Sequence, residues 1–254
     1  MRRPVATVGQ GDTPAAWFAS LPIVTKTLCV GTLLCSGLVT FGWISPMQII
    51  LHFPSITQRF ELWRLVTPYF FAGTFSFSFL MHLMALYENC MRYERMPFNT
   101  GGGGTSADFI WMLCLAVLAF SILGYMVGLV IFSEALLFMI MYVWSRREPE
   151  GALNIFGFKF QALYLPWIYL AIRLLMGNPI MTPLYGIAVG HLYYFLADVL
   201  PLSHNIDLIH TPAFVVRLVE SVTGVTRPNG PNMNAGQPMR MGYNWGQGRR
   251  LGVQ

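Results

Sequence analysis

Six long apolar stretches fill most of the chain before residue 203, and they limit the fold more than any other feature. A helix needs about 20 consecutive apolar residues to cross the hydrocarbon core of a bilayer. Only 11% of the residues are charged, against about 25% in a soluble domain, so polar side chains are too few to cover a globule. The sequence therefore predicts an all-α integral membrane protein with six transmembrane helices. These lie at about 22–43, 68–88, 109–127, 129–145, 161–176 and 183–201.

The apolar stretches divide the chain into three parts. Residues 1–20 form an amino-terminal segment, residues 21–202 the membrane domain, and residues 203–254 a polar tail. No small-residue cleavage site follows the first apolar stretch, so we expect it to remain as a membrane anchor. The last three stretches are only 16 to 19 residues long. Spans this short predict local thinning of the bilayer or re-entrant segments.

The basic residues predict the orientation. With the amino terminus in the cytosol, 13 of the 16 Lys and Arg side chains fall on the cytosolic side, in agreement with the positive-inside rule. Arg59 and Arg64 fall on the opposite side, and Arg173 lies within the fifth stretch. Both termini are therefore expected in the cytosol. The net charge of +5 is dispersed along the chain, which suits anionic lipid headgroups and does not suit a nucleic acid.

The connections between the stretches differ in character. A tight turn near Val127 and Gly128 makes the third and fourth spans an antiparallel hairpin, whereas the glycine-rich run at 99–106 predicts a flexible linker. The loop at about 45–67 is half apolar, so we expect it to lie in the headgroup layer. Within it, Trp63 is expected at the interface and Arg64 is expected to reach a lipid phosphate.

No pattern in the sequence predicts a metal, a cofactor or a nucleotide site. The cysteines lie in or beside apolar stretches and form no C-x-x-C pair, so buried free thiols are expected in place of disulfides or a zinc site. They are Cys29, Cys35, Cys90 and Cys114.

Seven short motifs follow one another along nearly the whole chain and together carry a family resemblance. Six of them are Ser20-Leu-Pro-Ile-Val-Thr-Lys26, Phe60-Glu-Leu-Trp-Arg-Leu-Val-Thr67, Ala107-Asp-Phe-Ile-Trp-Met112, Tyr142-Val-Trp144, Tyr164-Leu-Pro-Trp167 and Gly186-Ile-Ala-Val-Gly-His-Leu-Tyr-Tyr-Phe195. The seventh is the carboxyl-terminal segment 244–251. With these motifs the chain resembles the derlins, rhomboid-like pseudoproteases of the endoplasmic reticulum. The four glycines at 101–104 lengthen one loop beyond the usual derlin pattern.

The resemblance implies a six-span rhomboid-like bundle in the endoplasmic reticulum membrane that acts in protein quality control without catalysis. Such a bundle admits misfolded clients laterally, thins the bilayer and eases their passage to the cytosol for degradation. The loop with Trp63 and Arg64 is expected to shape the outer leaflet and gate client entry. Expected partners are misfolded proteins, the ubiquitin ligase machinery of this membrane and other derlin copies.

The tail segment 244–251 looks like the SHP box, which in the derlins binds valosin-containing protein, a hexameric AAA ATPase. Its aromatic and leucine side chains are apolar anchors, its glycines let the backbone approach a groove closely, and its arginines meet an acidic rim. The residues expected to bind the ATPase are Trp245, Gly246, Gly248, Arg249, Arg250 and Leu251.

A further helix is predicted before the box, at about 211–222. Thr211 and Pro212 suit the N-cap and the first helical position. Apolar residues then recur on one helical face, so an amphipathic helix on the cytosolic membrane surface is expected. They are Phe214, Val215, Leu218, Val219 and Val222.

Two residues in the last span, Gly186 and Gly190, form a G-x-x-x-G pattern, which predicts close packing of this span against the fourth. The same region raises an alternative, an active intramembrane protease, because Ser133 and His191 lie at comparable depths from the span ends. Ser133 lacks the G-x-S-G setting of rhomboid proteases, and Pro183 stands where their histidine stands. A hydrogen-bonded structural histidine inside the bundle is therefore the preferred interpretation of His191.

A third function class, a small-solute channel or transporter, also stays open, and separately from it the spans contain charged residues. Ionisable groups inside a membrane are costly and often functional, so Arg173 either snorkels or lines a lateral cavity together with His191. Glu134 and Asp198 lie near span ends, and Asp198 is expected at a membrane boundary. Transporters generally show inverted repeats, and this chain has no such internal symmetry.

Overall fold

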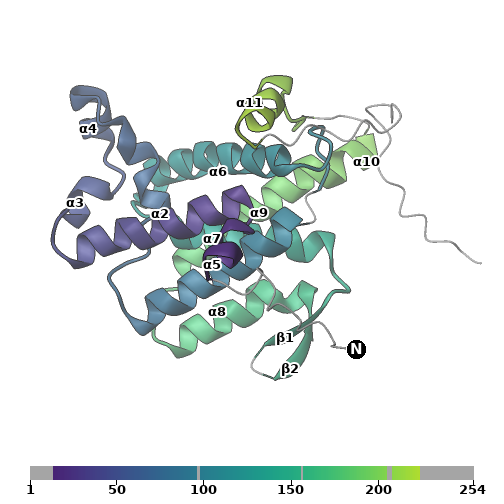
Figure 1. Cartoon of the computed structure of the whole chain (residues 1–254), viewed down its shortest axis with the longest axis horizontal. Coiled ribbons are helices and arrows are strands. Elements are labelled where there is room, and N and C mark those ends of the chain that lie inside the picture. The colour runs from purple at the N-terminus through teal and green to yellow at the C-terminus, as the bar shows by residue number, and fades with distance from the viewer. Residues whose placement is uncertain (1–13, 96–97, 156, 205–207, 224–254) are drawn as a thin grey trace, which may run out of the picture.

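The computed structural model describes residues 14–95, 98–155, 157–204 and 208–223. The expected ATPase-binding box at 244–251 lies outside the described residues. Helices dominate the described part, with one short antiparallel hairpin of strands (Figure 1). The chain begins with α1 (Pro14–Ala19), α2 (Ile23–Thr40), α3 (Pro46–Ile49), α4 (Phe53–Arg59), the 3-10 helices η1 (Leu62–Leu65) and η2 (Thr67–Tyr69), α5 (Phe77–Arg95), α6 (Ser106–Val127) and α7 (Ser133–Arg147).

The second half follows α7 with the strands β1 (Ala152–Ile155) and β2 (Phe158–Gln161), paired with Ala152 opposite Gln161. It continues through the 3-10 helix η3 (Ala162–Tyr164), α8 (Leu165–Leu175), α9 (Met181–Tyr194), the π-helix η4 (Phe195–Val199), α10 (Leu200–His204) and α11 (Ala213–Thr223). The β-hairpin has no counterpart among the elements that we predict from the sequence.

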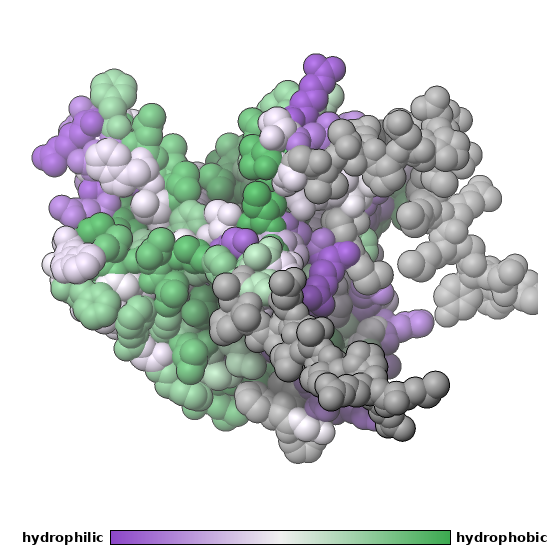
Figure 2. All heavy atoms as spheres, viewed as in Figure 1, coloured by the Kyte–Doolittle hydropathy of each residue, from purple (hydrophilic) through white to green (hydrophobic). Residues whose placement is uncertain are grey.

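Helix α7 forms the centre of the bundle, with α5, α8 and α9 packed against it. Twelve of its 15 residues are buried, so it has no face left for lipid. Around it, Phe109, Met112 and Phe120 of α6 are fully buried in the same core. On the face shown in Figure 2, an apolar zone covers the helices, and hydrophilic residues gather around α4 at the upper left and from α11 at the top down the right-hand side.

Three stretches of the described chain are long and apolar enough to cross a bilayer, namely Ile23–Thr40, Ser106–Val127 and the continuous helical run Met181–Ser203. The prediction of a helical membrane protein is confirmed at this level. The remaining candidates differ from simple spans, because α5 carries several charges and α7 and α8 are short. The count of six spans stays a prediction.

The predicted second stretch, 68–88, is wrong in its boundaries. Residues 67–69 form the short helix η2, and α5 begins only at Phe77 and continues to Arg95. The helix continues into its charged end, where the buried Glu94 side chain contacts the start of α2. The Glu94 carboxylate accepts hydrogen bonds from the backbone N–H groups of Val24 (2.9 Å) and Thr25 (2.7 Å), at the start of α2. It thus satisfies amide groups that Pro22, the N-cap of α2, leaves without a side-chain partner.

The hairpin of α6 and α7 has the predicted turn, but α7 begins later than expected. Gly128 ends α6 in the left-handed conformation, with φ of 74°, and its N–H donates to the carbonyl of Gly124. Residues 129–132 are not helical, because they contact the segment 45–69, which we call the first loop. The Leu51 N–H donates to the carbonyl of Val130, and the Phe132 N–H donates to the carbonyl of Pro68.

The glycine-rich loop is a hydrogen-bonded turn, so the prediction of a flexible linker at 99–106 is wrong. The N–H groups of Gly102 and Gly104 donate to the two oxygens of Asp108, at 2.8 and 2.9 Å. Gly104 has a φ of 70°, which favours glycine, and a Cβ on Gly102 would lie 2.6 Å from the Asp108 carboxylate. The run is therefore shaped by one carboxylate, which also forms the capping box of α6 with Thr105.

Candidate functional site

Helices α7 and α9 run parallel and make the closest helix contact in the bundle, through Gly186 and Gly190. A Cβ on Gly186 would overlap the backbone carbonyl of Ala135. A Cβ on Gly190 would lie 3.2 Å from the carbonyl oxygen of Met139. The lack of side chains at these two positions lets the backbones meet, as the G-x-x-x-G pattern requires.

Ser133 and His191 occupy different levels of the bundle, so the expectation that their depths match is wrong. The Ser133 hydroxyl donates to the carbonyl of Phe71 at 2.7 Å. The His191 ring is hydrogen-bonded through Nδ1 to the Tyr142 hydroxyl at 2.8 Å. Tyr142 follows Ser133 by nine residues, or about 13 Å along α7. Because α7 and α9 are parallel, Ser133 lies nearer the level of Pro183, and no Ser–His dyad forms.

His191 has a hydrogen-bond partner, but it lies at the surface and not inside the bundle as expected. Arg146 Nε donates to the Tyr142 oxygen at 3.0 Å, so the Tyr142 proton is available for Nδ1 of His191. The His191 side chain itself is exposed. This chain of three groups fixes the imidazole at the edge of α9.

Arg64 holds the first loop together, which corrects the expectation that it reaches a lipid phosphate. It is buried, and its Nη1 donates to the backbone carbonyls of Met47 (2.6 Å) and Ile50 (3.1 Å). Its Nε pairs with Glu61 at 2.5 Å. Trp63, next to it, is 53% exposed, and its place at the membrane interface stays a prediction. The two neighbours therefore differ in role: Arg64 stabilises the inside of the loop, and Trp63 lies at its surface.

Arg173 forms an ion pair with Glu134, which joins the end of α8 to the first turn of α7. Both side chains are mostly buried, and the Nε2 atom of the neighbouring His82 on α5 has no hydrogen-bond partner. Asp198 pairs with Arg147 at 2.9 Å. The charges expected at span ends are thus neutralised in pairs within the bundle.

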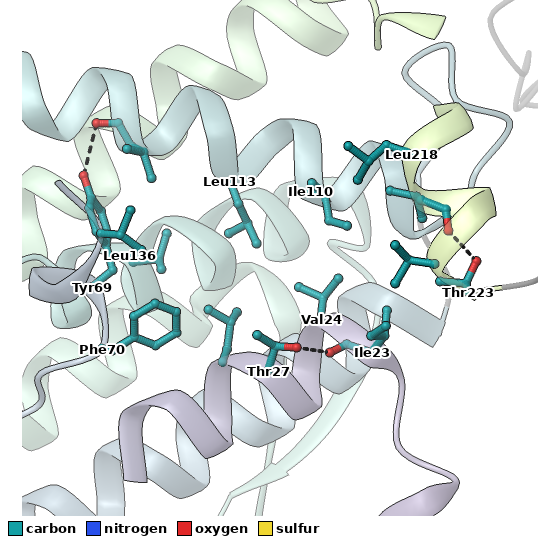
Figure 3. Close-up of a pocket in the computed structure, with 15 residues that line it drawn as sticks. Ile23, Val24, Thr27, Tyr69, Phe70, Ile110, Leu113, Leu136, Leu218 and Thr223 are labelled. Atoms are coloured by element: carbon teal, nitrogen blue, oxygen red, sulfur yellow. Dashed lines mark hydrogen bonds between the residues drawn. The ribbon is translucent and has the colours of Figure 1, made fainter. Parts of the chain in front are cut away.

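An apolar cavity of about 330 Å³ lies elsewhere, between α2, η2, α6, α7 and α11 (Figure 3). Its walls include Leu28, Tyr69, Leu113, Val117 and Leu218. Neither Arg173 nor His191 lines it, so the cavity that we expected near these two residues is not the one found here. Sequence reasoning could not locate it because its walls come from five separate elements.

The helix before the tail, α11, is fixed to the start of α6. The Thr211 hydroxyl donates to Asp108 at 2.6 Å, and the Thr211 N–H donates to the carbonyl of Thr100 at 2.9 Å. The apolar face predicted from the sequence is divided in two. The residues packed on α6 are Val215, Val216 and Val219, whereas those left exposed are Phe214, Leu218 and Val222. Helix α11 therefore has a packed face and a second, open apolar face.

The described residues include no group of three or more His, Cys, Asp or Glu side chains placed to hold a metal ion. Cys29, Cys35, Cys90 and Cys114 are free thiols; Cys90 is buried, whereas Cys114 is exposed. The box residues Trp245, Gly246, Gly248, Arg249, Arg250 and Leu251 lie beyond the part that the structure describes.

The family model and the individual relatives that match this chain point to the same family. The model of the Der1-like family matches residues 21–213. The chain is 33% identical to Derlin-1.2 of Zea mays, over 89% of this chain and 94% of that protein. It is 36% identical to the probable derlin-2 homolog of Dictyostelium discoideum, over 80% of this chain and 82% of that protein. It is also 34% identical to Derlin-1 of Arabidopsis thaliana, over 82% of this chain and 78% of that protein. With its helical bundle and the matched region reaching from the entry of α2 to the start of α11, this chain belongs to the Der1-like family.

Proposed function

We propose that this chain is a non-catalytic derlin of the endoplasmic reticulum membrane that assists the retrotranslocation of misfolded proteins for degradation. It thins the bilayer, admits clients laterally and recruits the AAA ATPase valosin-containing protein through its tail. The ATPase supplies the pulling energy, and the ubiquitin ligase machinery and further derlin copies complete the assembly. The proposal is supported by family membership together with one geometric observation, the shortness of the lipid-facing helix α8.

Helix α8 is too short to match a bilayer of ordinary thickness. Even with the 3-10 turn η3 before it, the apolar helical run Ala162–Leu175 extends only about 21 Å, whereas the hydrocarbon core is about 30 Å thick. It lies at the outside of the bundle, where Trp167 and Leu174 are exposed and Leu175 is 88% exposed. Lipid next to α8 must therefore either thin or leave polar backbone ends in hydrocarbon, and thinning is the less costly response.

A second observation on the opposite side of the bundle supports thinning. The Tyr69 hydroxyl, from the first loop, donates to the carbonyl of Val117 in the middle of α6. Helix α11 packs on the same helix at Ala107 and Ile110. Ala107 and Val117 are ten residues apart, or about 15 Å along the helix, about half of the usual hydrocarbon thickness. Two interfacial segments thus approach each other closely along α6.

The Arg173–Glu134 ion pair supports lateral admission of clients. It lies between α7 and α8 and is partly exposed, so a polar group on a client could approach it from the bilayer. Polar groups within hydrocarbon gain most from such partners, because no water is present to bind them. A client segment too polar for lipid would therefore find a favourable neighbour beside α8.

The proposed recruitment of the ATPase can be separated from the membrane functions by two matched tail variants. In cells that lack their own derlins, the double variant Trp245→Ala and Leu251→Ala should abolish co-purification with valosin-containing protein. It should also lengthen the half-life of a misfolded lumenal client in a translation chase. The control, Tyr243→Ala with Val253→Ala, removes comparable apolar groups from the same tail outside the box and should leave both readouts unchanged.

The outcomes separate the parts of the proposal. Unchanged ATPase recovery from the box variant would refute docking through 244–251. Failure of the unmodified chain to restore client degradation in these cells would refute the quality-control role itself.

A further inference from the structure

The cavity beneath α11 presents hydrocarbon to any guest, because its hydroxyl groups are turned onto backbone carbonyls. The Thr27 hydroxyl donates to Ile23 at 2.8 Å, and the Thr223 hydroxyl donates to Val219 at 2.8 Å. The Tyr69 hydroxyl donates to Val117 at 3.1 Å (Figure 3). Among the described residues that line it, none carries a formal charge. A guest of this cavity is therefore selected for apolar surface alone.

Water is a poor occupant of such a space. A buried water molecule needs two to four polar partners, and apolar cavities of about 150 Å³ stay dry. This cavity is about 330 Å³, at the lower end of the range of small-molecule pockets. Left empty, its walls would lose dispersion contacts over their whole area. Hydrocarbon is the chemistry that fills it.

The position of the cavity brings it next to lipid. Its two long walls are α2 and α6, both of which are long and apolar enough to cross a bilayer. Outside the cavity the same helices expose further apolar side chains, Leu34 on α2 and Leu118 on α6. Acyl chains therefore lie against both helices beside the cavity, and the apolar surface continues from them into it.

The open face of α11 forms one end of the cavity. Leu218 and Val222 line it, and yet they are 61% and 66% exposed. An occupant would cover them, and it would complete the burial of a helix that packs on α6 along only one face. Phe214 lies one turn earlier on the same open face but does not line the cavity.

A single acyl chain is flexible, so it can follow walls that come from several separate elements. A protein helix is a rigid rod about 10 Å across and cannot adapt in this way.

We infer that one acyl chain of a membrane phospholipid occupies this cavity, inserted between α2 and α6 and covered at one end by α11. The headgroup stays outside, since the described part of the wall offers it no charged or unpaired polar partner. The bound acyl chain forms part of the surface on which α11 packs. The position of α11 therefore depends on lipid as well as on the contact between Thr211 and Asp108.

The test uses the full chain in phosphatidylcholine vesicles that contain a phosphatidylcholine with a photoreactive group near the end of one acyl chain. After irradiation, mass spectrometry locates the labelled residues. We expect labelling of Leu113, Val117 and Leu218 in addition to the labelling that bulk lipid gives at the outward-facing Leu118. The variant Leu113→Trp fills the cavity and should lower labelling at Leu218 about tenfold, equivalent to about 1.4 kcal/mol of binding. Its control, Leu118→Trp, adds the same group on the lipid side of α6 and should leave the pattern unchanged.

A second pair of variants guards against misfolding of the first. Leu218→Ser removes apolar wall from an exposed position and should lower labelling at Leu113, whereas Phe214→Ser on the same helix should not. Labelling of Leu118 without labelling of Leu113, or labelling at Leu218 that survives Leu113→Trp in a folded protein, would overturn the proposal. So would a photoreactive residue at Leu113 that captures a second polypeptide and no lipid.

Discussion

The Thr211 hydroxyl donates a 2.6 Å hydrogen bond to the buried carboxylate of Asp108, across 103 positions of the chain. The same carboxylate receives the backbone N–H groups of Gly102 and Gly104. One side chain thus shapes the glycine-rich loop, caps α6 and anchors α11. The helix that leads into the tail is held to the membrane domain by a specific contact, and its position does not depend only on the attraction of its apolar face to lipid.

Loss of this contact should release α11. The variant Thr211→Val keeps the size of the side chain but removes the hydroxyl from a site that is 1% exposed. We expect a loss of about 0.5–1.5 kcal/mol for one hydrogen bond, because Thr100 and Gly102 still donate to the same Asp108 oxygen. Hydrogen–deuterium exchange should rise in residues 213–223 and remain unchanged in α7. The control is Ser221→Ala, whose hydroxyl bonds only within α11, to Leu218; equal exchange in both variants would contradict the anchoring role.

The contact between α7 and α9 should tolerate no added atom at Gly186. In Gly186→Ala the new Cβ would meet the backbone of Ala135, which cannot move like the end of a flexible side chain. Overpacking of this kind costs about 1–3 kcal/mol. Thermal unfolding in detergent should show a lower midpoint. Gly37→Ala on α2 is the matched control, since its new Cβ would lie at an ordinary 3.4 Å from Phe75, and its midpoint should not fall.

Arg64 should resist replacement even by lysine. A lysine carries one compact charge and lacks the planar fork that contacts Glu61 and the carbonyls of Met47 and Ile50 at the same time. Arg64→Lys should therefore loosen the first loop and speed its limited proteolysis from the loop side. In Arg59→Lys, which changes an exposed position in the same loop, the loop should be cleaved at the rate of the unmodified protein. A protected loop in Arg64→Lys would show that charge alone suffices.

The ion pair of Glu134 and Arg173 should behave as a unit. Glu134→Ala leaves a mostly buried guanidinium without its partner and should cost about 3 kcal/mol. The double variant Glu134→Ala and Arg173→Ala removes both charges and should be more stable than the single variant. A double-mutant cycle on unfolding midpoints measures this coupling. Additive effects would mean that the two groups do not interact in the membrane.

The length of α8 should control bilayer thickness. Insertion of four residues, Leu-Ala-Leu-Leu, after Leu175 adds about 6 Å to the helix and leaves Arg173 in register with Glu134. Lipid beside it should then be thicker, as reported by spin labels at graded depths in nanodiscs. Client degradation should slow as well. The same insertion in the tail, after Asn229, should change neither measurement; normal degradation with a thickened bilayer would separate thinning from function.

Much of the fold follows from local sequence patterns, and much of the site does not. Apolar runs and the glycine after Val127 predict helices and a hairpin because these are set by neighbouring residues. The role of Arg64 escapes such reasoning, since its carbonyl partners at Met47 and Ile50 carry no side-chain signature. The same is true of the glycine run. Its composition indicates flexibility, and only the structure shows that its backbone N–H groups surround the Asp108 carboxylate.

The error over Ser133 and His191 has a different source. Depths counted from the ends of two spans are comparable only if both helices begin at the same level. The contacts of Gly186 with Ala135 and of His191 with Tyr142 fix the true register between α7 and α9. That register comes from packing between elements about fifty residues apart, which single-sequence periodicity does not encode.

The capping of α2 by Glu94 also bears on how the protein is made. The amide groups of Val24 and Thr25 emerge from the ribosome about seventy residues before the carboxylate that receives them. During synthesis the amide groups at the start of α2 therefore lack their hydrogen-bond acceptor until α5 has been inserted beside it. A nascent chain that is stopped before residue 94 should leave the start of α2 without its buried acceptor, so this contact can form only once α5 is complete.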